Sequence, residues 1–259
     1  MRIAKSHTTP MDYTRGVEDC ISILAEELCK SNSKLLEECA RFIHGTTIVT
    51  NAIIEGRVAK VGFVTTRGFR DILTLREGGK DDPFNTHEHY PQPYVHRYLT
   101  LPITERINAE GEVEVPLDEY DAKQALQTLI ELYHVDAVAV CFLWSVANPV
   151  HEKMWGAAPE ANWPFISIPR VGSSNPIIRE YRRAASTVLE ASVRPLISQY
   201  VQAFNSKLKR GGYKGTLYMV TSSGSVLPAE EVARKGLSIF ASDPAMTPAA
   251  ARWSGFIEG

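Results

Sequence analysis

Two short turns, at residues 44–47 and 65–68, carry several side chains that could do chemistry. They contribute imidazole, hydroxyl and guanidinium groups, which hydrogen-bond anionic oxygens and, in the case of imidazole, move protons. Each turn follows an apolar run and precedes a helical pattern, so each lies between a predicted strand and a predicted helix. In open α/β sheets ligands bind beyond the carboxyl ends of the strands. The two turns therefore predict a binding cleft.

Each turn also has a purely structural interpretation. A threonine in front of a helix is often only its cap, and a glycine in a turn often serves the backbone alone. A third turn of small residues, Thr221 to Gly224, follows the apolar run at 217–220. Parallel strands present their carboxyl ends together, so a shared cleft requires the turns at His44, Thr65 and Thr221 to lie on one side of the sheet system.

The patterns around these turns predict the elements that position them. Apolar spacing predicts a helix over 17–28, a β-branched run predicts a strand over 58–64, and alternation on both sides of a glycine predicts a β-hairpin over 103–117. Asp118 is the expected cap of an amphipathic helix that leads to a buried strand over 135–143. The alternation of strands and helices indicates an α/β fold.

The second half of the chain begins after a weakly patterned stretch that is rich in proline, alanine and tryptophan. We place a domain boundary near Arg170, which divides the chain into residues 1–170 and 171–259. The longest helical pattern, over 175–209, contains Pro195, which we expect to kink or divide the helix.

Composition excludes several classes of function. The chain has 259 residues, a formal net charge of −2 and 44% hydrophobic residues, which favours neither nucleic acid nor a membrane surface as a partner. The apolar runs are too short to span a bilayer and the amino terminus is unlike a signal peptide, so we expect a cytoplasmic protein. The cysteines form no CxxC pair, and Cys20 and Cys141 lie in apolar patterns typical of buried free thiols.

A long polar loop, over 76–97, leaves two interpretations open. His87, His89 and His96 have the chemistry of metal ligands, but no acidic cluster accompanies them, and a solvated or subunit-contacting loop is favoured over a zinc site. Arg76 and Lys80 in the same loop are candidate contacts for an anion.

Several of these segments together resemble a known family. The segments are HGTTIVTNAIIEG, VGFVTTRGFRDIL, REGGKDDPF, VDAVAVCFLWSVANPVHE and NPIIREYRRAASTVLEASVRPL. They resemble the hydantoinase A/5-oxoprolinase family, and within it the ketone carboxylase branch, such as the acetophenone carboxylase subunits. The resemblance covers nearly the whole chain and is looser between 155 and 170.

The resemblance implies a fold and an activity. The fold would be the N-terminal half of an actin-like ATPase, ribonuclease H-like and incomplete. The activity would be ATP-dependent with Mg²⁺, phosphoryl transfer activating the oxygen of a cyclic amide before hydrolysis or of a ketone enol before carboxylation. The implied partners are the small cyclic amide or ketone and a hydantoinase B-like companion subunit.

The resemblance also gives the candidate residues roles. His44, Thr46 and Thr47 would position substrate or phosphate, and Arg67 and Arg70 would stabilise developing negative charge. The candidate cofactor-binding residues are Gly45, Asn51, Thr221, Ser222 and Gly224. Second-rank candidates are Arg179, Glu180 and Asn148, although Asn148 before a proline is more simply a turn residue. Asp243 stands where relatives usually have glycine, which weakens the case for a close backbone approach there.

The family's two DxGGT-type phosphate turns are not found in the sequence. We therefore expect an internal piece of a longer protein that does not hydrolyse ATP alone, or a non-catalytic module that binds a partner subunit. The family's first strand would pair with the strands containing Phe42 and residues 58–64, so we expect an uncovered sheet edge and self-association.

Overall fold

The computed structural model describes residues 2–7, 9, 14–78, 80–82, 84–157, 177–242, 244–248 and 251–252. The chain forms two compact units. Unit 1 comprises Met1–Thr50, Ile197–Ala233 and Ser238–Gly259, and unit 2 comprises Asn51–Leu196 and Arg234–Leu237. The predicted domain boundary near Arg170 lies outside the described residues and stays a prediction.

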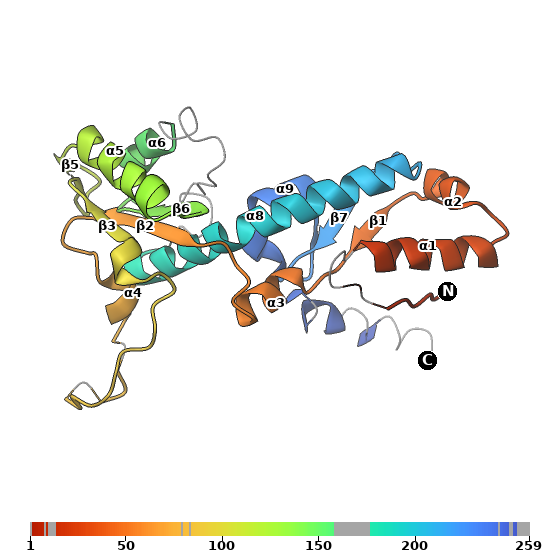
Figure 1. The fold of residues 1–259 in the computed structure, drawn as a ribbon, viewed down its shortest axis with the longest axis horizontal. Helices are drawn as coiled ribbons and strands as arrows, with labels where there is room; N and C mark the ends of the chain where they lie inside the picture. Colours follow the sequence, from red (N-terminus) through yellow and green to blue (C-terminus); the bar gives the residue numbers. More distant parts are fainter. Residues whose placement is uncertain are drawn as a thin grey trace. The chain divides into compact units, whose positions relative to one another are not determined.

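Unit 1 is built around a three-stranded sheet of order β1-β7-β8 (Figure 1). β1 (Phe42–His44) runs parallel to β7 (Leu217–Val220), which pairs antiparallel with β8 (Val226–Pro228). Helices α1 (Arg15–Glu27) and α2 (Asn32–Glu38) belong to this unit. So does α9 (Ala229–Arg234), except for its last residue. The helix expected over 17–28 is therefore confirmed.

Aromatic contacts hold β1 against the second half of the long helix α8 (Glu180–Arg210). The Phe42 and Phe204 rings meet edge to face with centroids 5.7 Å apart, and Phe204 is fully buried. The Phe42 backbone N–H donates to the Tyr213 hydroxyl at 3.0 Å. These contacts fix the position of the residues that follow β1.

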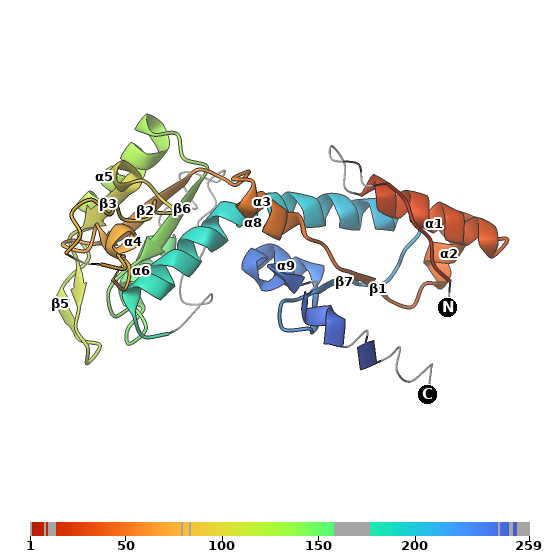
Figure 2. The ribbon, with the colours of Figure 1, turned by 90° about the horizontal axis from the view of Figure 1, so that it is seen from below.

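Unit 2 contains a second three-stranded sheet, of order β3-β2-β6, with all strands parallel (Figures 1 and 2). The strands are β2 (Val61–Thr66), β3 (Thr100–Ile103) and β6 (Ala137–Cys141). Every residue of β2 and β6 is buried, as expected for parallel strands covered on both faces. The strand expected over 58–64 exists but begins at Val61.

Helices surround this sheet and a short hairpin extends from it. The helical segments are α4 (Ile72–Leu75), η1 (Arg97–Leu99), α5 (Glu119–Gln127), the π-helical η2 (Thr128–Leu132) and α6 (Val150–Ala157). β4 (Arg106–Ile107) and β5 (Val113–Val115) form the expected antiparallel hairpin. The Asp118 side chain accepts hydrogen bonds from the Tyr120 and Asp121 amides, which confirms its predicted role as a cap.

Packing of η2 on the central strand depends on a missing side chain. A Cβ atom at Gly62 would lie 2.8 Å from both methyl carbons of Leu129. Leu129 is fully buried, so it has no open space into which to move. Only glycine at this position allows η2 to lie so close to β2.

A buried carboxylate joins the short segment Arg234–Leu237 to unit 2. Glu190 on α8 is 2% exposed, and its two carboxylate oxygens accept hydrogen bonds from the Gly236 and Leu237 amides at 2.7 and 3.0 Å. These amides open the short helix η4 (Gly236–Ile239), whose N–H groups have no partner within the helix itself. Burial raises the pKa of Glu190, because the charged form is costly away from water.

Two expectations about the elements are wrong in part. β2 has neighbours on both sides, so it leaves no open edge, whereas β1 is the outermost described strand of its sheet. Helix α8 continues from Glu180 to Arg210 and is not divided at Pro195. Among the residues that the structure describes, no helix is long and apolar enough to cross a membrane.

A candidate site at the strand ends

Two of the three predicted turns meet at one sheet edge in unit 1. His44 pairs in register with Met219, so Thr46 and Thr221 stand at equivalent positions beyond β1 and β7. Because the strands are parallel, both turns follow carboxyl ends. Thr65 lies within β2, and the turn that follows this strand belongs to unit 2.

His44 is held as a neutral imidazole at this edge. Its Nε2 lies 2.7 Å from the Tyr200 hydroxyl, and its ring meets Phe204 edge to face with centroids 4.8 Å apart. Burial lowers its pKa from 6.5 to about 4. At pH 7 the ring therefore carries no positive charge, and of its two nitrogens one can donate and the other accept a hydrogen bond.

The residues that follow His44 lead into α3 (Ile48–Ile54). The Thr46 hydroxyl accepts a hydrogen bond from the Ile48 amide at 3.3 Å, so it helps to start this helix. A Cβ atom at Gly45 would meet only Val220, at an ordinary 3.8 Å, so sterics alone do not require glycine there. Thr47 is exposed at the turn, and Asn51 lies one helical turn further along α3.

The Thr221 turn closes the hairpin between β7 and β8. The strand β8, which was not predicted, lies between this turn and the helix α9, which begins at Ala229. The hydroxyls of Thr221, Ser223 and Ser225 lie 2.8 to 2.9 Å from one another and form a triangle. Gly224 has a φ of +75°, and its amide donates to the Thr221 carbonyl at 3.0 Å. Ser222 is tied by its amide and its hydroxyl to the Ser238 carbonyl.

The two candidate catalytic arginines make contacts within unit 2. Arg67 donates to Asp121 Oδ2 and to the Thr104 hydroxyl, both at 2.9 Å. Arg70 donates to the carbonyl oxygens of Thr100 and Arg97 at 2.8 and 2.9 Å. Both guanidinium groups therefore fasten the chain around β3 in unit 2, whereas His44 belongs to unit 1.

The remaining candidates also have local partners. Asn148 donates to the Gly111 carbonyl and accepts from the Val150 amide, as expected of a turn residue at the start of α6. Arg179 forms an ion pair with Glu77, and Arg76 donates to the Gln92 carbonyl. Within the described part of the chain, no group of three or more His, Cys, Asp or Glu residues could hold a metal ion. Asp243 lies outside the described residues.

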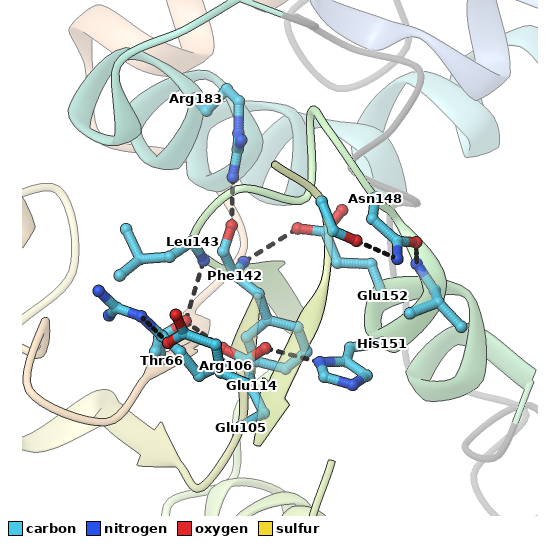
Figure 3. Close-up of polar contacts among 12 residues, drawn as sticks. Thr66, Glu105, Arg106, Glu114, Phe142, Leu143, Asn148, His151, Glu152 and Arg183 are labelled. Atoms are coloured by element: carbon cyan, nitrogen blue, oxygen red, sulfur yellow. Dashed lines mark hydrogen bonds and ion pairs between the residues drawn. The ribbon is translucent and has the colours of Figure 1, made fainter. Parts of the chain in front are cut away.

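A buried polar network in unit 2 was not predicted from the sequence (Figure 3). The Thr66 hydroxyl donates to Glu105 Oε1 and accepts from the Leu143 amide at 2.9 Å. His151 Nδ1 lies 2.7 Å from Glu105 Oε2, and both side chains are almost inaccessible to solvent. The network therefore joins the carboxyl ends of β2, β3 and β6, with Glu105 at its centre.

Beside this network, Glu152 and Arg183 both hydrogen-bond the backbone of Phe142. The Phe142 amide donates to Glu152 Oε1 at 2.9 Å, and Arg183 of α8 donates to the Phe142 carbonyl (Figure 3). Burial raises the pKa of Glu152. Burial also raises the pKa of the Cys141 thiol to about 12, so this cysteine stays protonated and unreactive, although Arg183 lies beside it.

The signal for this network is positional. Thr66, Glu105 and the segment that leads to His151 each follow the carboxyl end of a predicted or observed parallel strand. A search of strand ends for polar residues of every kind would have found them.

Two models of known protein families match the chain. The family model described as the hydantoinase/oxoprolinase N-terminal region matches residues 1–158, and the model described as hydantoinase/oxoprolinase matches residues 183–258. The chain belongs to the hydantoinase/oxoprolinase family. The resemblance inferred from its motifs is thereby confirmed.

Relatives in this family share the fold over nearly the whole chain. The caprolactamase alpha subunit of Pseudomonas jessenii is 31% identical over 252 residues, which cover 96% of this chain and 36% of that protein. The crystal structure of that ATP-dependent caprolactamase superposes with a TM-score of 0.87. The acetophenone carboxylase gamma subunit of Aromatoleum aromaticum is 29% identical over 235 residues, 86% of this chain and 32% of that protein.

A solved acetone carboxylase in its nucleotide-free form shares the α/β fold, with a TM-score of 0.82 at 20% identity. It is matched over 98% of this chain and 37% of its own. The chain thus spans about a third of the length of these hydantoinase/oxoprolinase relatives, two of which are named as subunits.

Proposed function

We propose that the chain is part of an ATP-dependent enzyme that activates a carbonyl or enol oxygen by phosphoryl transfer. The substrate would be a cyclic amide that is then hydrolysed, or a ketone that is then carboxylated. The proposal is supported above all by the likeness to the ATP-dependent caprolactamase over 96% of this chain.

The edge formed by β1 and β7 is the proposed position for the phosphoryl group or the substrate oxygen. Hydroxyl groups and a neutral imidazole donate hydrogen bonds to phosphate oxygens without a charge of their own. The residues that would do so are Thr46, Thr47 and His44 on one turn, with Ser223 on the other. This donor set fits a phosphate.

The same edge does not supply a cluster of carboxylates for Mg²⁺. Mg²⁺ prefers carboxylate, phosphate and water oxygens. The described residues contain no group of three acidic or other ligating side chains, and we assign the metal to none of them. ATP would supply the phosphoryl group, and Mg²⁺ would neutralise charge on its phosphates.

Arg67 and Arg70 hold β3 and its flanking turns in place. Their guanidinium groups already donate to unit 2 oxygens, as described above. The role proposed for these two arginines, stabilising negative charge on a transferred phosphoryl group, would require their guanidinium groups to exchange some of these hydrogen bonds for contacts with the phosphate.

The fate of the substrate oxygen tests the proposal. The enzyme assembled from this chain and its companion polypeptides is given ATP, Mg²⁺ and a cyclic amide with ¹⁸O in its carbonyl. Phosphoryl transfer to that oxygen forms a P–O bond and releases ADP. Attack of water on the activated carbon forms a tetrahedral adduct, from which the ring nitrogen leaves as an amine after it gains a proton, so that the C–N bond breaks and an acyl phosphate remains. A second water attacks the acyl carbon and releases phosphate that carries the label, which mass spectrometry detects.

We expect ¹⁸O in the phosphate and a dependence of ADP formation on the amide or the ketone. Ring opening with unlabelled phosphate would contradict phosphoryl transfer to the oxygen. An assembled complex without any substrate-dependent ADP formation would favour the alternative, a non-catalytic module that binds a partner subunit.

A further inference from the structure

The loop at residues 80–96 of unit 2, which we call the finger, presents an exposed aromatic side chain at its far end. The finger is the gold segment that extends below its unit in Figure 1. The Phe84 side chain is 92% exposed, and Tyr94 is 53% exposed. Scattered apolar residues are ordinary on protein surfaces, but a phenylalanine that is nearly fully exposed on a projecting loop is a potential binding anchor.

Two carboxylates, those of Glu88 and Asp82, accept hydrogen bonds from backbone amides of the finger. Glu88 accepts hydrogen bonds from the Asp81 and Asp82 amides at 2.9 and 3.1 Å. The Asp82 carboxylate in turn accepts from the Phe84 amide at 3.1 Å. The Asp81, Asp82 and Phe84 amides therefore all have carboxylate partners within the finger.

The root of the finger is attached to the body of unit 2. Lys80 lies over the Tyr90 ring, 5.2 Å from its centroid, and joins the two arms of the loop. Val95 is 3% exposed and packs in the core, while Arg76 donates to the Gln92 carbonyl at 3.0 Å. An anchor on an ordered loop loses less conformational entropy on binding than one on a flexible loop.

The charge of the finger narrows the choice of partner. Lys80 contributes one positive charge and Asp81, Asp82 and Glu88 contribute three negative charges, a net of −2 with the histidines neutral. Negative charge repels nucleic acid and anionic lipid surfaces. It suits a folded protein whose apolar pocket is rimmed by lysine or arginine.

We propose that the finger docks a companion subunit, with Phe84 inserted into an apolar pocket that has a basic rim. This inference rests on the proposed function in one respect, that the chain works in a multi-subunit enzyme. Two relatives named above are themselves subunits, the alpha subunit of caprolactamase and the gamma subunit of acetophenone carboxylase.

The test measures binding of this chain to a purified hydantoinase B-like subunit by sedimentation velocity and biolayer interferometry. Phe84→Ala is expected to weaken binding at least 30-fold, because buried aromatic anchors dominate interface energies. Tyr120→Ala is the matched control, since Tyr120 is 74% exposed on α5 of the same unit. The control is expected to change the Kd less than twofold.

Two further variants separate the anchor from the order and charge of the loop. Glu88→Gln weakens the hydrogen bonds to the two amides and should weaken binding about threefold to tenfold. Asp81→Lys with Asp82→Lys should slow association and reduce the salt dependence of the rate. Circular dichroism and the Tm of Phe84→Ala should match the wild type, because its side chain has no buried contacts to lose.

Binding of Phe84→Ala within twofold of the wild type would overturn the proposal. So would a variant that loses only self-association, which would make the finger a contact between copies of this chain. Substrate-dependent ADP formation is measured on the same complexes. A Phe84-dependent complex without that activity refutes the proposed function alone, and an active complex insensitive to Phe84→Ala refutes the finger alone.

Discussion

His44 Nε2 and the Tyr200 hydroxyl lie 2.7 Å apart, so the residue at the end of β1 is tied directly to helix α8. Phe204, one helical turn after Tyr200, covers the imidazole ring from its edge. The hydrogen bond and the ring contact fix where the imidazole stands, and burial keeps it neutral.

The neutral state of His44 predicts how stability depends on pH. Its pKa is about 4 in the folded protein and 6.5 in the unfolded chain, so the unfolded chain binds more protons between these values. The resulting stability is complete above about pH 6.5 and is lost as the pH falls to about 4, by no more than about 3 kcal/mol. Urea unfolding at pH 7.5, 5.5 and 4.5 measures this loss.

The variant His44→Gln should flatten this part of the stability profile, whereas His89→Gln, on the exposed finger, should leave it unchanged. An identical slope in wild type and His44→Gln would show that other groups cause the acid sensitivity.

The same residue predicts an effect on activity. In the assembled enzyme, His44→Ala should reduce substrate-dependent ADP formation by more than about threefold, equivalent to roughly 0.7 kcal/mol of barrier. The reason is the loss of a positioned hydrogen-bonding group at the proposed site. Steady-state assays of His44→Ala and of the control His89→Ala make the measurement. Turnover of His44→Ala within about threefold of the wild type would return His44 to a structural role.

Substitution of Gly62, which lies in the core of unit 2, should lower the free energy of unfolding. Gly62→Ala places a methyl group 2.8 Å from Leu129, and overpacking of this kind costs about 1 to 3 kcal/mol. Gly45→Ala is the matched control, because its new methyl group meets Val220 at 3.8 Å. Chemical denaturation should separate the two variants, and equal stability would mean that η2 moves freely away from β2.

Glu105 and His151 form a buried pair, so we expect the effects of substituting them on the free energy of unfolding to be strongly coupled. Glu105→Ala or His151→Ala alone leaves a buried polar partner unsatisfied and should cost about 2 to 4 kcal/mol. The double variant should cost clearly less than the sum, with a coupling of about 1 to 3 kcal/mol. The exposed pair of Arg67 and Asp121 is the comparison, with an expected coupling below about 1 kcal/mol. Additive effects at Glu105 and His151 would contradict a shared network.

Local patterns predicted much of the fold correctly. The strand at Val61–Thr66, the Asp118 cap and the hairpin at 106–115 depend on neighbours in the sequence, which a pattern records. The strand that follows the Thr221 turn was not predicted, because Val226–Pro228 is too short to form a recognisable strand pattern. Pairing with β7 makes it a strand, and that contact is tertiary.

The candidate site was predicted less completely. His44 and the Thr221 turn share an edge, as the motif order suggested, but Arg67 is engaged by Asp121, which is 54 residues away in the sequence. Glu105 is 39 residues from Thr66 and 46 from His151. No periodicity encodes such distances, so only the three-dimensional structure reveals which polar groups are already paired.

The triangle of hydroxyls at Thr221, Ser223 and Ser225 has a consequence for how long a ligand stays. Each hydroxyl already has a partner, so a bound oxygen replaces one hydrogen bond with another of similar strength. The net gain is small, and the turn recovers its own bonds as soon as the ligand leaves. In the proposed reaction, short residence at this turn would suit a step in which phosphate must depart before the next substrate enters.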